Sequence, residues 1–198
     1  MLLNTRVIDL SDERAALAGF LLAQFGAEVV LVEPPEGAAI RHCPPFAGDQ
    51  PGVERSLHHL GFSRGKKSVA IDWRTPAGAD ELDAMLASAD AVILSGSQGE
   101  HAQAGLPALS ELMKRHPHLV VANVSGFGLT GPKADWAASD LVCGAAGFQQ
   151  SVTGDYDRPP LRTSVPQVFH HAAADAAVGV LLDLAERETS GLGQLIDL

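Results

Sequence analysis

Cysteine is scarce in this sequence, with 2 among 198 residues, Cys43 and Cys143. Neither belongs to a C-x-x-C pair or to another spacing typical of metal ligands, so we predict no metal site and no disulfide framework. A reduced, cytoplasmic setting is therefore expected. The first residues show no charged segment followed by an apolar one, and no signal peptide is predicted.

Basic residues are also few: 14 Lys and Arg stand against 24 Asp and Glu, which gives a formal net charge of -10. An acidic protein is repelled by phosphate backbones and by anionic lipids, so nucleic acid and membrane are excluded as main partners. The apolar runs are shorter than the ~20 residues that a membrane-spanning helix needs. Hydrophobic residues still make up 46% of the chain, which is enough for the core of one domain over 1–198.

The turn after the first predicted strand has no glycine and reads Leu10-Ser-Asp-Glu-Arg14. Without glycine, the backbone of this turn cannot approach a pyrophosphate as dinucleotide-binding proteins do. The sequence also has no G-x-x-x-x-G-K-[ST] phosphate loop and no G-x-S-x-G elbow. An NAD-binding or nucleotide-sugar-binding protein is therefore disfavoured.

Short apolar segments rich in β-branched residues alternate with helical patterns along the chain. This alternation predicts an α/β fold: an open, mostly parallel Rossmann-like sheet with helices on both faces. We expect strands at 6–10, 28–33, 67–72, 91–94, 119–124 and 193–198. We expect helices at 13–25, 77–87, 107–116, 139–151 and 167–188, and a loop at 34–60.

The helix expected at 167–188 begins with two adjacent histidines, His170 and His171, followed by an alanine-rich stretch. His171 and Asp175 are four residues apart, so they share one helix face. Imidazole titrates near neutral pH and a carboxylate can orient it, so the pair can act as an acid and base. The alternative is that His171 and Asp175 form a purely structural pair near the start of a helix.

Two further segments are suited to holding a ligand. Arg64-Gly-Lys-Lys67 is a basic cluster in an acidic protein, and it either contacts phosphates or forms a solvated turn. Ser125–Pro132 is rich in glycine and follows a predicted parallel strand. Glycines such as Gly128 let a ligand lie close to the backbone, although the same composition is typical of a plain turn.

Taken in chain order, these and other motifs resemble the class III CoA-transferase family. That family includes formyl-CoA transferase, carnitine CoA-transferase and alpha-methylacyl-CoA racemase. The resemblance covers essentially the whole chain, and the motifs are specific in combination. The motifs that carry the resemblance lie at residues 7–11, 26–37 with Arg41, 64–72, 125–132, 139–142, 153–162 and 186–194.

The resemblance implies that 1–198 is the large, Rossmann-like, CoA-binding domain of such a protein, with the C-terminal half of the family fold missing. Family members transfer CoA between carboxylic acids through an aspartyl intermediate. The substrates implied are acyl-CoA and a carboxylic-acid acceptor, and the partner implied is a second copy, giving a homodimer, or a complementary chain. The family's CoA contacts fall on Arg41, Phe62, Arg64, Lys66, Gly128, Ser139 and Asp140.

Three departures from the family pattern bear on activity. The slot of the catalytic aspartate, shortly after Val165-Pro166, holds Phe169, and a phenyl ring cannot attack a thioester. His171 and Asp175 remain the acid/base candidates of this helix. The segment 95–99 carries no basic residue, which puts CoA affinity in question. Ser139 stands where the racemase pattern has a histidine, so a racemase is the weaker branch.

Two functions follow. The first is a CoA-transferase-like protein acting on acyl-CoA thioesters, with low activity for this chain alone. The second is a non-catalytic CoA-binding or partner subunit that completes the site of another chain.

Overall fold

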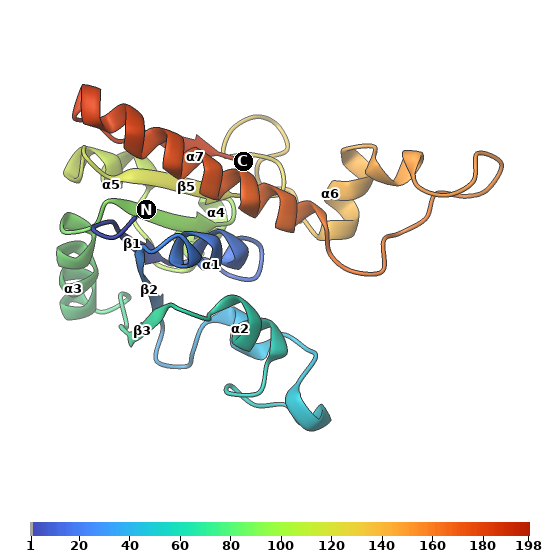
Figure 1. Cartoon of the computed structure of the whole chain (residues 1–198), viewed down its shortest axis with the longest axis horizontal. Coiled ribbons are helices and arrows are strands. Elements are labelled where there is room, and N and C mark those ends of the chain that lie inside the picture. The colour runs from blue at the N-terminus through green and yellow to red at the C-terminus, as the bar shows by residue number, and fades with distance from the viewer. Residues whose placement is uncertain (1) are drawn as a thin grey trace.

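Six parallel strands form one sheet in the computed structural model, which describes residues 2–198. Their order across the sheet is β3-β2-β1-β4-β5-β6 (Figure 1). This arrangement confirms the predicted open, parallel α/β sheet. The strands are β1 (Arg6–Asp9), β2 (Glu28–Glu33), β3 (Lys67–Ala70), β4 (Ala91–Ser95), β5 (Val120–Val124) and β6 (Leu195–Asp197).

Helices cover both faces of the sheet. Those packed on one face are α1 (Ala16–Gln24) and α7 (Val168–Ser190), and those packed on the other are α3 (Pro76–Ala87) and α5 (Leu109–Arg115). Three shorter helices lie among the connections: α2 (Leu57–Phe62), α4 (Gln98–Gln103) and α6 (Asp140–Ala146). Single 3₁₀ turns occur at Ala39–His42, Ala47–Asp49 and Gln149–Val152.

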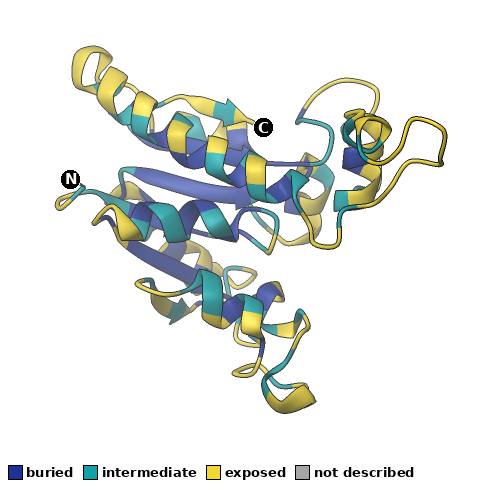
Figure 2. Cartoon of the chain, turned by 45° about the vertical axis from the view of Figure 1, so that its right-hand side comes forward, coloured by how far each residue is buried: buried dark blue, intermediate teal, exposed yellow. Residues whose placement is uncertain are grey.

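Successive residues of the central strands point into two separate apolar cores. In β1, Val7 packs with α1 and α7, whereas Ile8 packs with α3 and α5. This alternation follows from the two-residue period of a strand. Because helices cover both faces, the central strands are buried almost throughout (Figure 2), as is usual for parallel sheets.

The longest helix, α7, has 23 residues and ends at Gly191, whose φ of 75° suits the left-handed cap of a helix. By length and composition α7 would be apolar enough to cross a membrane. Its inner side packs instead against β5 and α1. The buried residues of α7 are Phe169, Ala173, Ala176, Ala177, Val180 and Asp183, so α7 is a core helix of the α/β fold.

Two helices were not expected from the sequence. α2 begins at Leu57, inside the segment 34–60 where Pro and Gly predict a loop, and the Ser56 side chain caps it. α4 follows β4 directly and begins with a capping box formed by Ser97 and Glu100. The helix expected at 139–151 is interrupted, because Phe148 adopts a left-handed backbone conformation with a φ of 62°.

Candidate functional site

A cavity of about 380 Å³ lies at the start of α7, beside the carboxyl ends of the central strands. In open α/β sheets this edge is where ligands bind. Below it is called the α7 cavity. Its lining comes from the β1–α1 turn and from α2, α4, α6 and α7, and consists of Asp12, Glu13, Arg14, His58, Glu100, Ala138, Ser139, Asp140, Pro166, Phe169 and His170.

Aromatic rings form one side of the α7 cavity. Phe169 is 8% exposed and belongs to the core between α1, α7 and the sheet. The ring of His170 packs on Phe62 with 5.3 Å between centroids, and Phe62 lies 6.1 Å from the ring of His58. The start of α7 therefore presents an apolar ring with a neighbouring imidazole to the cavity.

Asp140 and Ser139 hold the two helices that border the α7 cavity. One Asp140 carboxylate oxygen accepts hydrogen bonds from the backbone N–H groups of Val168 and Phe169, at 2.8 and 3.3 Å. The Ser139 hydroxyl oxygen accepts from the backbone N–H of Val142 at 3.3 Å and caps α6. A carboxylate at a helix N-terminus satisfies free N–H groups and favours the helix dipole. Both residues thus line the cavity, and Asp140 also holds the backbone at Phe169.

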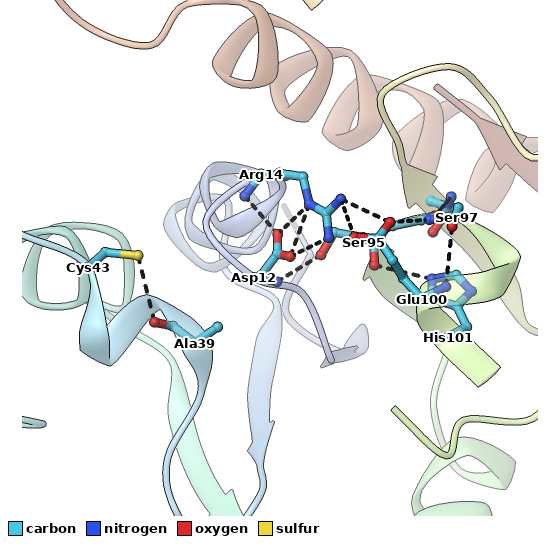
Figure 3. A network of polar contacts seen from close by, with 10 residues as sticks. Asp12, Arg14, Ala39, Cys43, Ser95, Ser97, Glu100 and His101 are labelled. Carbon is cyan, nitrogen blue, oxygen red and sulfur yellow. Dashed lines mark hydrogen bonds and ion pairs between the residues drawn. The ribbon is translucent and has the colours of Figure 1, made fainter. Parts of the chain in front are cut away.

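Arg14 is a site residue that we did not expect from the sequence. Its guanidinium lies 2.6 Å from a carboxylate oxygen of Asp12 and 3.0 Å from one of Glu100 (Figure 3). Burial alone would lower the pKa of Arg14, but these two carboxylates outweigh it and raise the pKa. Its position in the sequence could have predicted this role, because a charged residue in the turn after the first parallel strand lies at the ligand-binding edge of the sheet.

Lys66, expected to contact CoA phosphates, lies inside the protein. Its ammonium nitrogen is 2.7 Å from a carboxylate oxygen of Asp9 and 3.0 Å from the carbonyl oxygen of Ala16. The side chains of Lys66 and Asp9 are 2% and 0% exposed. Lys66 thus ties the turn before β3 to the end of β1, and it does not line the α7 cavity. Its predicted role as a CoA contact stays a prediction.

Arg41 also has its charge matched within the fold. Its guanidinium forms two hydrogen bonds with Glu33 and a further one with Glu54. It borders a separate cavity of about 220 Å³ beside β2 and β3 rather than the α7 cavity. A ligand phosphate at Arg41 would have to compete with two carboxylates.

The remaining predicted CoA contacts, Arg64 and Gly128, lie outside the α7 cavity lining. Arg64 is exposed, and its guanidinium carbon lies 5.1 Å from the centre of the Phe20 ring. Gly128 has a φ of 80°, which explains the need for glycine there. The next backbone N–H, that of Leu129, donates to Asp197. Among these predicted contacts, Arg64 presents the most exposed positive charge.

His171 and Asp175 lie on the outer side of α7 and are both exposed. Within residues 2–198, no hydrogen bond or ion pair joins them, and neither lines the α7 cavity. The imidazoles that line the cavity are those of His58 and His170. Across the same described range, no group of three or more His, Cys, Asp or Glu side chains is placed to hold a metal ion.

The buried Glu33 carboxylate makes stability depend on pH. Burial alone would raise its pKa, but hydrogen bonds from Arg41, Ser68 and the backbone of Ala38 outweigh this and lower the pKa to about 2. A lowered pKa stabilises the fold above the ordinary pKa of 4.5, and this stabilisation is lost as the pH falls toward about 2. The Glu33 carboxylate contributes up to about 3 kcal/mol to the free energy of unfolding at neutral pH.

We therefore expect Glu33→Gln to lower the free energy of unfolding at neutral pH, and we expect this deficit to shrink as the pH falls from about 5 toward about 3. Urea denaturation across that range measures it. Glu54→Gln is the control, because Glu54 contacts the same Arg41 with a side chain that is 76% exposed, and it should cost less than about 1 kcal/mol. A deficit for Glu33→Gln that does not change with pH would contradict the assignment.

Comparison with known proteins shows the family to which this chain is related. Residues 2–198 match the model of CoA-transferase family III. The chain is 35% identical over 194 residues to the succinyl-CoA:(R)-benzylsuccinate CoA-transferase subunit BbsE of Thauera aromatica, which covers 98% of this chain and 47% of that protein. It is 37% identical over 197 residues to the succinyl-CoA–D-citramalate CoA-transferase of Chloroflexus aurantiacus, covering 98% of this chain and 48% of the relative.

A solved structure shows the same likeness. A CAIB/BAIF family protein from Brucella suis superposes with a TM-score of 0.87 at 32% identity, covering 99% of this chain and 52% of that one. The chain thus spans about half the length of the relatives it matches. Because the family model matches residues 2–198 and the fold agrees, this chain belongs to CoA-transferase family III.

Proposed function

We propose that this chain binds acyl-CoA and forms the CoA-binding part of an enzyme that transfers CoA between carboxylic acids. The observation that carries this proposal is the α7 cavity, found at the carboxyl edge of the sheet in a chain that matches the family along its length. A ligand site at this edge is the rule for open α/β sheets.

The charges around the α7 cavity suggest which end of acyl-CoA enters it. Asp12, Glu13, Glu100 and Asp140 line it together with one arginine. An acidic lining repels phosphates and suits the uncharged pantetheine and thioester end. In this orientation the thioester lies against Phe169 and His170, and the phosphates stay outside the cavity, where Arg64 is exposed.

The chemistry of transfer needs a nucleophile beside the thioester. A carboxylate oxygen can attack the thioester carbonyl and expel the CoA thiolate, whereas the Phe169 ring has no lone pair to offer. Asp140 lines the cavity, but it is engaged by the backbone N–H groups at the start of α7. We therefore propose that the reacting carboxylate comes from outside this chain, from a complementary chain or a second copy.

A non-catalytic subunit is the second candidate function. It is favoured by the placement of Phe169 in the cavity wall and of His171 and Asp175 on the outer side of α7. The relative from Thauera aromatica is itself named as a subunit of a CoA-transferase. Both candidates share the binding of acyl-CoA and a nucleophile from outside this chain. They differ in whether the residues that line the α7 cavity take part in the transfer.

Calorimetric titration with succinyl-CoA tests the shared step. We expect His170→Ala to weaken binding about fivefold, the effect of losing ~1 kcal/mol of ring contact at the cavity wall. His171→Ala is the matched control on the outer side of α7 and should leave the dissociation constant unchanged. No binding of CoA or succinyl-CoA at millimolar concentration would overturn the proposed function.

Intact-mass measurement after incubation with succinyl-CoA tests whether the nucleophile lies outside this chain. We expect no covalent succinyl or CoA adduct on the wild-type chain, because the slot after Val165-Pro166 holds Phe169. An adduct on this chain would show that it carries a nucleophile of its own. If that adduct disappeared in Asp175→Asn, Asp175 would be identified as that nucleophile rather than as an acid or base.

A further inference from the structure

A second cavity, of about 240 Å³, adjoins the α7 cavity at the same edge of the sheet. Its lining includes Trp73, His101 and Leu106, and it is called the Trp73 cavity below. The two cavities share Asp12, Arg14 and Glu100 as lining residues and have separate linings elsewhere. The ion pair between Arg14 and Glu100 therefore stands where the two cavities meet.

This ion pair bridges the gap between two neighbouring strands. Arg14 follows β1, and Glu100 lies in α4, which follows β4 (Figure 3). β1 is flanked by β2 on one side and by β4 on the other, so the chain reverses its direction of winding between β1 and β4. The crevice at such a reversal is the ligand-binding position of doubly wound sheets. The Arg14–Glu100 contact closes that crevice.

The side chains of Arg14 and Glu100 differ in how firmly the surrounding structure holds them. Asp12 accepts hydrogen bonds from Nε and Nη2 of Arg14, and the Arg14 side chain is 15% exposed. Glu100 is held by the backbone N–H of Ser97 at 2.7 Å, but half of its side chain is exposed. Rotation of Glu100 toward solvent would open the crevice while Arg14 stays in place.

Neither cavity alone is large for a ligand of the size of acyl-CoA. Their volumes lie near or below the lower end of the ~300–1,000 Å³ typical of small-molecule sites. We propose that the Arg14–Glu100 ion pair is a partition between the α7 cavity and the Trp73 cavity, and that it opens when an extended pantetheine arm spans both. This inference rests on the proposed function, because the ligand it invokes is that of a CoA-binding chain.

A closed partition lowers the apparent affinity, because only the open fraction of molecules binds. Glu100→Gln weakens the ion pair and keeps an N3 residue that can still complete the capping box with Ser97. Glu100→Ala removes the side chain from the crevice altogether. We expect both variants to bind pantetheine and CoA up to about fivefold more tightly than the wild-type chain, which corresponds to the ~1 kcal/mol upper value for a solvent-accessible ion pair that competes with binding.

Ser97→Ala is the matched control, because it removes the hydroxyl oxygen that accepts from the backbone N–H of Glu100 but leaves the ion pair intact. Its dissociation constants should match those of the wild-type chain. Calorimetry with pantetheine and with CoA, together with thermal melting to verify folding, provides the measurement. Pantetheine is the informative probe because it carries no phosphate.

The outcomes are separable. Tighter binding of both ligands by the Glu100 variants supports the partition. Tighter binding of CoA without any change for pantetheine would show only that a carboxylate repels phosphates, and would overturn the partition. Unchanged binding of both ligands would overturn it as well. Failure of the wild-type chain and of every variant to bind CoA at millimolar concentration would overturn the proposed function together with this inference.

Discussion

Replacing Lys66 with methionine is expected to lower the free energy of unfolding by about 3–5 kcal/mol, because it leaves the Asp9 carboxylate buried without its counter-charge. Asp9 is fully buried and 2.7 Å from the Lys66 ammonium. The backbone N–H and hydroxyl of Ser11 also donate to Asp9, but these groups carry no net charge. Urea denaturation of the purified chain measures the loss.

The adjacent residue provides the control. Lys67 pairs with Glu28 on the surface, with side chains 71% and 43% exposed, and Lys67→Met should cost less than about 1 kcal/mol. A double variant, Lys66→Met with Asp9→Leu, replaces both charges by apolar groups and should recover much of the stability lost in Lys66→Met. Equal losses for Lys66→Met and Lys67→Met would contradict the buried ion pair.

Phe169→Ala is expected to destabilise the fold by about 3–5 kcal/mol, since it removes a buried ring from the core under α7. Phe169 is 8% exposed and packs with residues of α1 and the sheet. Phe148 is 74% exposed, and Phe148→Ala should change stability by no more than about 0.5 kcal/mol. Thermal and urea unfolding of both variants make the comparison.

Leucine variants at the same two positions test whether the Phe169 ring contributes to ligand binding in the α7 cavity. If Phe169 lines the α7 cavity, Phe169→Leu should keep most of the stability and still change the affinity for succinyl-CoA, whereas Phe148→Leu should change neither. A Phe169→Ala variant as stable as Phe148→Ala would show that the ring does not pack in the core. It would also remove the structural reason for assigning the cavity wall to Phe169.

The sheet could be predicted because each central strand carries its own signal. β-branched, apolar runs bounded by turn residues fixed the strands to within a few residues, and the alternating helices required parallel crossovers. The short helices α2 and α4 escaped prediction because each has 6 residues. A helix that short has too few turns for a periodic pattern and is held by its capping side chain.

The site was harder to predict than the fold. Counting from a motif singled out Phe169, which lines the α7 cavity. Charge alone could not reveal that Lys66 meets Asp9, which is 57 residues away in the chain. The pair His171 and Asp175 illustrates a different limit. A spacing of four residues places them on one helix face, yet α7 is apolar nearly all round, so periodicity does not tell which face meets the sheet.

The alanines on the inner side of α7 act as a spacer between the helix and the sheet. Ala173, Ala176 and Ala177 are buried against the core that β5 contributes to, and α7 behaves as a rod about 34 Å long. A larger residue at any of the three would lift the rod and displace its first turn, which carries Phe169 and His170. The depth of the α7 cavity is thus set by alanine side chains that do not line it.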